Sequence, residues 1–417
     1  GFSGDTIISW DSLRFQPRFT ATAANIGYFW WSNDIGGHML GGSDDTMAAR
    51  WFQLGCFSPI NRLHSSNSGF TSKEPWRYSR DARATMEAHL RLRHRLVPYL
   101  YTWARRSAGE GIAPVRPVYH DHPRELAAYE HRGSFCFGDL LVVPFTSPLD
   151  VATGLGRELT WLPDGVWYDL PTGRRYEATT GGRGRMLSLS RPLDRIGVLA
   201  RAGSVIPLAG NLTEAAGDNP RELEIVVVPG GSGSFTLEED DGSAQPGQDQ
   251  IARTHMALTW PDAEEEDGAD VVLRIRLEGA AEVVPASRLV TVRLLAGRVA
   301  GAWLGVGERA RRLATEEVSG DGFTLGAGTL VHLEELSRQE LIDGVQLVLR
   351  GTKHSPADWR DEVHAILDAA RVEYMAKDLA WDAVQRGLSG TALLGELEAL
   401  GLPETLRAAV AEVLPHS

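Results

Sequence analysis

Cysteine is scarce in this chain: its 417 residues include two, Cys56 and Cys136. Two cysteines cannot build a disulfide framework or a multi-cysteine zinc site. Both stand between apolar residues, which predicts two buried free thiols. Because free thiols are typical of reducing compartments, we expect a cytoplasmic protein.

Long apolar runs and an excess of positive charge are also missing. No run reaches the roughly 18 apolar residues that a membrane helix needs. The net charge of −13 argues against binding the phosphate backbone of a nucleic acid, which needs a concentrated basic patch, but suits a neutral ligand. The stretch His120-Asp121-His122 lacks a third ligand at a plausible spacing, so the sequence predicts neither a metal nor a cofactor.

Tryptophan is concentrated in residues 1–112, which hold half of the 12 in the chain. Short apolar runs alternate there with helical stretches, a pattern typical of an α/β fold. The runs 26–31 and 51–57 predict strands buried on both faces of a parallel sheet. Residues 80–108 predict a long helix, kinked at Pro98 and stopped by the glycines that follow it.

The pattern becomes all-β after residue 112 and helical near the end. Short apolar runs between turns predict an antiparallel β-sandwich over 113–212 and a second β-rich domain over 213–352. Alanine, leucine and glutamate dominate residues 353–417, which predict a small helical appendage.

Particular strands are expected in the second β-rich domain. The run 223–228 predicts one strand, and the runs 271–277 and 289–295 predict a strand pair. The acidic run 264–267 is typical of an exposed loop.

Polar side chains follow the apolar runs of the first region. Asp34 ends the run that contains Trp30 and Trp31, and His64 ends a later segment. Carbohydrate sites combine carboxylates, imidazoles and aromatic faces, so these residues favour a sugar site. The residues alone leave other interpretations open: His64 as a satisfied core residue, and Asp5, which follows Ser-Gly, as a turn or capping aspartate.

Several short motifs together resemble the last strands of the catalytic barrel of glycoside hydrolase family 31. The match in order and spacing extends over about 60 residues and continues to about residue 212. The motifs are Gly4-Asp5, Asp34-Ile35-Gly36-Gly37, Arg50-Trp51-Phe52-Gln53-Leu54-Gly55 and Arg62-Leu63-His64.

The resemblance implies three domains and no cofactor. Residues 1–112 would be the C-terminal part of a (β/α)8 barrel, hence a partial barrel. A proximal β-sandwich over 113–212 and a distal β-rich domain over 213–352 would follow. The helical extension 353–417, a fourth domain predicted from composition, lies beyond the resemblance.

The resemblance also implies roles for five side chains. Asp5 matches the general acid/base, and Asp34 and His64 match residues that hydrogen-bond the sugar. Trp31 belongs to the aromatic wall before Asp34. His38 stands where many members have phenylalanine, so it is expected at the edge of the sugar ring, where it could change which substituent is accepted.

The activity implied is that of a retaining, exo-acting α-glucosidase that acts on an oligosaccharide or α-glucoside. An α-xylosidase and an α-transglucosylase remain alternatives. From another class, an inactive fragment or a non-catalytic carbohydrate-binding module remains open.

The family's nucleophilic aspartate belongs to an earlier strand, and no match to that region follows Gly1. We therefore expect the chain alone to be inactive and an upstream segment to complete the barrel. The loop 73–76, after His64, is expected at the site entrance.

Overall fold

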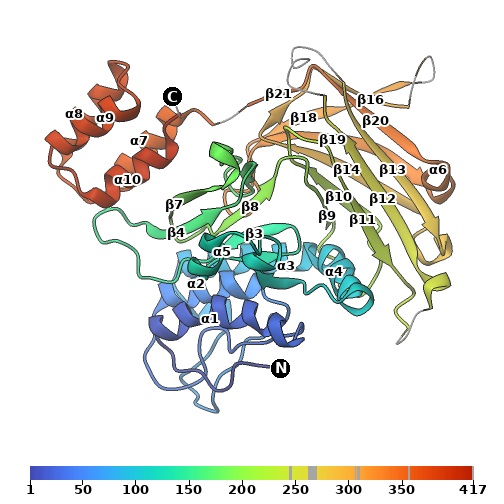
Figure 1. Cartoon of the computed structure of the whole chain (residues 1–417), viewed down its shortest axis with the longest axis horizontal. Coiled ribbons are helices and arrows are strands. Elements are labelled where there is room, and N and C mark those ends of the chain that lie inside the picture. The colour runs from blue at the N-terminus through green and yellow to red at the C-terminus, as the bar shows by residue number, and fades with distance from the viewer. Residues whose placement is uncertain (244–246, 262–269, 306, 308–309, 356, 416–417) are drawn as a thin grey trace.

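The computed structural model describes residues 1–417 except 244–246, 262–269, 306, 308–309, 356 and 416–417. A helical N-terminal region lies against β-sheets, and a helical tail lies beside them (Figure 1). The helices of the first region are α1 (Trp10–Thr22), α2 (Asp45–Cys56), α3 (Arg80–Arg95) and α4 (Val97–Glu110).

The prediction of strands at 26–31 and 51–57 was wrong. Residues 51–56 belong to α2 and are all buried. A run buried on every side has no polar face, so its periodicity does not separate a helix from a strand. The segment 26–31 leaves a short 3-10 turn at Ile26 and continues without regular structure.

The parallel arrangement expected of that region persists as three extended segments that lie side by side. Isolated parallel bridges join Phe2 to Ser32, Ile7 to Met39, and Ile35 to Leu63. Residues 1–112, all of them described, have bridges in place of longer strands. The partial barrel therefore remains a prediction, although the order of the segments is compatible with it.

The kink in the long predicted helix is confirmed. The chain leaves α3 at Leu96 and re-enters a helix with Pro98 in its first turn, where a proline needs no N–H partner. Gly111 ends α4 with φ of 72°, a left-handed conformation that glycine adopts without strain.

Antiparallel sheets follow, as predicted. One sheet has the strand order β1-β2-β3-β8-β5-β6, and β4 pairs with β7. A short helix, α5 (Leu126–Glu130), lies between β1 and β2 in sequence. The strands are β1 (Val115–Pro117), β2 (Phe135–Phe137), β3 (Leu140–Val143), β4 (Gly156–Leu162), β5 (Val166–Asp169), β6 (Arg175–Glu177), β7 (Arg185–Arg191) and β8 (Gly197–Arg201).

The second β-rich region contains two larger sheets, ordered β18-β19-β14-β10-β9 and β11-β12-β13-β20-β16-β17, and the small pair β15-β21. Helix α6 (Arg338–Asp343) precedes β20. The strands are β9 (Val205–Ala209), β10 (Glu222–Val227), β11 (Gly233–Glu239), β12 (Ala252–Thr259), β13 (Val271–Gly279), β14 (Ser287–Leu295), β15 (Gly297–Arg298), β16 (Gly301–Leu304), β17 (Arg311–Leu313), β18 (Thr315–Val318), β19 (Gly328–Ser337), β20 (Val345–Arg350) and β21 (Lys353–His354).

The strand expected at 223–228 is confirmed as β10. The strands at 271–277 and 289–295 exist as β13 and β14, but they lie in different sheets, so their predicted pairing was wrong. β14 instead pairs in parallel with β10, which is distant in sequence. The acidic run 264–267 lies outside the described residues.

The helical tail predicted from composition is present and has a core of its own. Helix α10 packs against β7, which places the tail beside the first β region (Figure 1). Its helices are α7 (Trp359–Ala369), α8 (Tyr374–Gln385), α9 (Gly390–Ala399) and α10 (Glu404–Val413).

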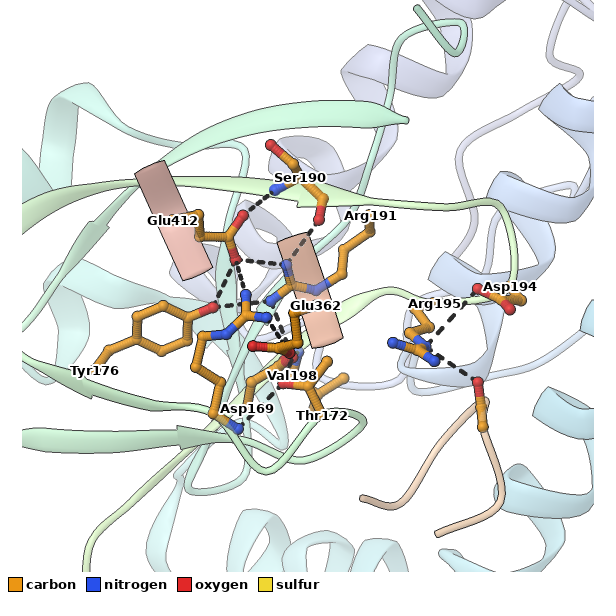
Figure 2. Close-up of polar contacts among 12 residues, drawn as sticks. Asp169, Thr172, Tyr176, Ser190, Arg191, Asp194, Arg195, Val198, Glu362 and Glu412 are labelled. Carbon is orange, nitrogen blue, oxygen red and sulfur yellow. Dashed lines mark hydrogen bonds and ion pairs between the residues drawn. The ribbon is translucent and has the colours of Figure 1, made fainter. Parts of the chain in front are cut away.

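A buried carboxylate of the tail, Glu412, connects α10 to the β-sheets (Figure 2). Its Oε1 accepts hydrogen bonds from Arg191 at 2.6 Å, Arg174 at 3.0 Å and the Tyr176 hydroxyl at 2.6 Å. Its Oε2 accepts from the backbone N–H of Ser190 at 2.6 Å. Burial opposes the charged form, but the two arginines outweigh it and lower the pKa of Glu412.

Candidate active site

Asp5 lies in the first extended segment, which hydrogen bonds hold in place on both sides. The Ser3 N–H donates to Ser32 O at 3.0 Å, and the Ile8 N–H donates to Met39 O at 3.0 Å. The Asp5 side chain is 53% exposed. The backbone around it is therefore fixed while the carboxylate stays open to a ligand.

Asp34 precedes a tight glycine turn. The Gly37 N–H donates to Asp34 O at 2.7 Å, and Gly36 and Gly37 have φ of 86° and 78°. A Cβ at position 37 would lie 2.8 Å from Ile8 Cα, so a side chain there would collide with backbone. This turn brings His38 back beside Asp34.

Helix α2 supports the Asp34 segment from behind. The Trp51 indole N–H donates to Asn33 Oδ1 at 2.9 Å. A Cβ at Gly55 would lie 2.4 Å from Ile35 Cδ1, so glycine leaves the room that Ile35 fills. These two contacts give the tryptophan and the final glycine of the Arg-Trp-x-Gln-x-Gly motif a positioning role.

The arginine and glutamine of that motif attach α2 to the loop between β7 and β8. Buried Arg50 donates to Arg195 O at 2.6 Å and to Arg191 O at 3.0 Å. Gln53 donates to Leu193 O at 2.8 Å. The first β region thereby holds the helix that supports the Asp34 segment.

Four of the five predicted site residues come together around His38. Its Nε2 lies 3.7 Å from Asp5 Oδ2, and its Nδ1 lies 3.6 Å from Asp34 Oδ2. The centroids of the His38 and His64 rings are 4.8 Å apart. Asp34 is fully buried, and its Oδ2 has no hydrogen-bond partner among the described residues. A buried carboxylate oxygen without a donor is suited to accept from a ligand hydroxyl.

Trp31, the fifth predicted residue, lies elsewhere. Its ring packs edge-on to Phe19, with centroids 5.0 Å apart, and beside Tyr28 at 6.2 Å. Among the described residues, no hydrogen bond, ion pair or ring contact links it to the four-residue cluster. The resemblance placed Trp31 in the aromatic wall of the sugar site. In this structure its ring packs against Phe19 of α1 instead.

Two basic side chains next to the cluster were not among the predicted site residues. The Arg62 Nη2 donates to Asp34 Oδ1 at 2.6 Å. Arg62 stands two residues before His64 on an extended segment, where residues of that spacing share a face, and this signal could have identified it. Lys73, in the loop expected at the entrance, donates to Gly36 O at 2.6 Å, and burial lowers its pKa to about 8.

A hollow of about 360 Å³ lies next to the cluster, and the residues that line it include Gly36, Asp44, Phe70, Lys73 and Tyr78. Its size suits a small ligand. It places open volume beside the turn that carries Asp34 and not within the cluster itself.

Comparisons with known proteins relate the chain to one family. The family model for the TIM-barrel domain of glycosyl hydrolases family 31 matches residues 1–103, and that for the C-terminal domain matches residues 111–206. Both matches are to domains of glycoside hydrolases. The chain is similar to glycosyl hydrolase family 31 in both matched domains, which confirms the resemblance found in the motifs.

Curated relatives include an α-xylosidase and an α-glucosidase. An α-xylosidase of Saccharolobus solfataricus is 29% identical over 272 residues, which are 64% of this chain and 35% of that protein. The lysosomal α-glucosidase of Mus musculus is 26% identical over 296 residues, 67% of this chain and 30% of that protein. The chain thus spans about a third of the length of these relatives.

Solved structures share the fold. A family-31 dextranase of Flavobacterium johnsoniae, complexed with isomaltotriose, is 20% identical with a TM-score of 0.68 over 84% of this chain and 44% of that one. A family-31 α-xylosidase of Xanthomonas citri is 26% identical with a TM-score of 0.59 over 70% of this chain and 32% of that one.

Proposed function

We propose that this site binds a terminal α-linked glucose and takes part in its hydrolysis with retention of configuration. The observation that carries the proposal is the convergence of Asp5 and Asp34 on one imidazole, at 3.7 Å and 3.6 Å. Sugar hydroxyls need such acceptors and donors in close array.

Asp5 acts as the general acid and base. It gives its proton to the leaving glycosidic oxygen, and it later takes a proton from the water that releases the sugar. Asp34 Oδ2 accepts a hydrogen bond from a sugar hydroxyl, and His64 hydrogen-bonds the same sugar. If a second sugar's hydroxyl replaces water, the same steps transfer the glucose.

The nucleophilic carboxylate comes from a chain segment outside residues 1–417, in the earlier part of the barrel. Retention needs a second carboxyl group about 5–5.5 Å from the acid. Large apolar side chains of the first segments are exposed, including Phe2 at 48%, Ile7 at 49% and Ile26 at 73%, as expected of surfaces that another segment covers. Residues 1–417 alone are then inactive.

The test is Asp5→Asn in the protein with its complete barrel. Loss of a general acid should slow cleavage of a disaccharide, whose leaving group is poor, by about 10²–10⁴-fold. An activated aryl glucoside should lose far less at the bond-breaking step. The control is Asp11→Asn, which alters a carboxylate that is 90% exposed on α1. Equal losses on both substrates would argue against Asp5 as the acid.

An α-xylosidase is the second candidate, because relatives of that name are 29% and 26% identical to this chain. His38 would discriminate the two sugars by the room beside C6. Comparing kcat/KM on an α-glucoside and an α-xyloside, in wild type and His38→Phe, would show which sugar the site prefers.

A cytoplasmic location is part of the proposal. Both cysteines are free, and burial raises the pKa of each thiol to about 12. Among the described residues, no helix is long and apolar enough to cross a membrane.

A further inference from the structure

Asp34, His38 and His64 form a set of metal donors as well as a sugar site. One potential ligand atom from each lies within 4.8 Å of the others. We propose that these three side chains bind a divalent transition-metal ion of the zinc type, which competes with the sugar. The ion binding does not rest on the proposed hydrolysis, because it is measured without substrate, whereas the competition with the sugar rests on the proposed sugar site.

The geometry between Asp34 and His38 fits such an ion. Zinc takes carboxylate oxygen and imidazole nitrogen at about 2.0–2.2 Å in tetrahedral geometry, which places two ligand atoms roughly 3.3 Å apart. Asp34 Oδ2 and His38 Nδ1 are 3.6 Å apart, and both are buried without a hydrogen-bond partner among the described residues. Two facing, unpartnered donor atoms therefore need little movement to share an ion.

Asp5 supplies the outer support that metal-binding histidines usually have. His38 Nε2 lies 3.7 Å from Asp5 Oδ2, on the ring position opposite the one that faces Asp34. A carboxylate at the second nitrogen of a ligating imidazole fixes the ring and increases its basicity. The arrangement Asp5–His38–ion is of this kind.

His64 completes the three ligands. Its ring is tilted 39° to that of His38, with the centroids 4.8 Å apart. Two imidazoles and one carboxylate, with a position left for water, is a ligand set that zinc and similar ions accept. Its donor atom lies within 4.8 Å of the other two, so His64 must move closer to share an ion with them.

Nearby positive charge limits the affinity. Arg62 already occupies Asp34 Oδ1 at 2.6 Å, and Lys73 donates to Gly36 O at 2.6 Å. We therefore expect weaker binding than at closed, four-ligand zinc sites, and no contribution of the ion to folding.

The test is titration of the 417-residue chain with Zn²⁺ by calorimetry and with Co²⁺ by visible absorption. Wild type should bind one ion with a tetrahedral Co²⁺ spectrum, and glucose should weaken that binding. His38→Gln and His64→Gln should each weaken it by at least about tenfold. The matched control is His255→Gln, because His255 also faces a carboxylate, Glu278, at 3.4 Å, but its side chain is 42% exposed.

Asp34→Asn adds an independent variant, and thermal unfolding of each variant checks that it is folded. An absence of saturable binding in wild type, or unchanged affinity in folded His38→Gln, would overturn the metal site. Neither result bears on the leaving-group test of Asp5, so the two proposals fail separately.

Discussion

Two buried carboxylates in this chain, Asp34 and Glu412, have opposite surroundings. Both oxygens of Glu412 accept hydrogen bonds, from three side chains and one backbone N–H (Figure 2). Asp34 has Arg62 on one oxygen and no hydrogen-bond partner on the other among the described residues. Full burial is common to both, so burial alone does not distinguish a structural carboxylate from a binding one.

The two carboxylates differ in whether both of their oxygens have a hydrogen-bond donor. A buried ion pair with every lone pair engaged fixes the contact between two parts of a chain, and removing one partner leaves the other charges uncompensated. A buried oxygen without a donor costs stability unless something binds there. Glu412 therefore connects the tail to the β-sheets, whereas Asp34 remains available to a ligand.

The largest expected effect is that of Glu412→Ala. It removes the carboxylate that Arg191 and Arg174 share, and breaking a buried pair of this kind costs about 3–5 kcal/mol. Because Arg191 keeps Asp169 and Arg174 keeps Glu362, we expect the lower end of that range. We expect α7–α10 to become sensitive to limited proteolysis, and the unfolding temperature to fall. Glu404→Ala is the control, since Glu404 is on the same helix, 78% exposed, and pairs with Arg157 at 3.3 Å. If Glu412→Ala and Glu404→Ala had equal effects, the buried carboxylate would not hold the tail in place more than an exposed one does.

The next largest effect is expected for the pH dependence of stability that His89 causes. This histidine of α3 is fully buried, and its Nε2 has no hydrogen-bond partner among the described residues. Burial lowers its pKa to about 4. Unfolding restores a pKa near 6.5, so the unfolded state binds the proton first as pH falls.

The contribution of neutral His89 to the free energy of unfolding is thus complete above about pH 7. It declines as the pH falls from 6.5 towards 4. The decline between pH 7.5 and 5 should be about 2 kcal/mol. Urea unfolding followed by tryptophan fluorescence should show a shallower pH dependence in His89→Leu than in wild type. If the unfolding free energy of wild type and of His89→Leu depended on pH in the same way, burial would not control the protonation of His89.

An effect on stability similar to that of His89 is expected for Gly37→Ala. Alanine at φ of 78°, with its Cβ 2.8 Å from Ile8 Cα, should cost about 1–3 kcal/mol. Because the turn positions His38, ligand binding should fall more than stability does. Gly27→Ala is the matched control, with φ of 79° but no neighbour within 4 Å of the added Cβ. Equal losses of binding in both would show that the turn does not position the site.

The sequence predicted the convergence at the site better than the local structure around it. Asp34 and His64 were expected together because each follows an apolar run of one predicted parallel sheet. The runs themselves form no strands, but a parallel bridge from Ile35 to Leu63 joins the extended segments that carry the two residues. The run 51–57 was misassigned because a fully buried helix lacks polar periodicity. Arg62 belongs to the motif that ends at His64, but its contact with Asp34, 28 positions away, could not be predicted from the motif.

The contact between the tail and the β-sheets could not be predicted. Glu412 and Tyr176 are 236 positions apart, and neither belongs to a motif. Helical composition predicts that residues 353–417 fold as helices, but the partner of a single buried glutamate is decided by tertiary packing. For the same reason, the separate sheets of β13 and β14 were not foreseen.

The most direct test of the account is a titration of this chain with glucose, followed by NMR chemical shifts. Wild type and Glu412→Gln should show the same saturable binding, and Asp34→Asn should weaken it by about tenfold or more, since a hydrogen bond to a charged group contributes about 1.5–3 kcal/mol. Binding that is unchanged in Asp34→Asn would contradict the assignment of this cluster as the sugar site.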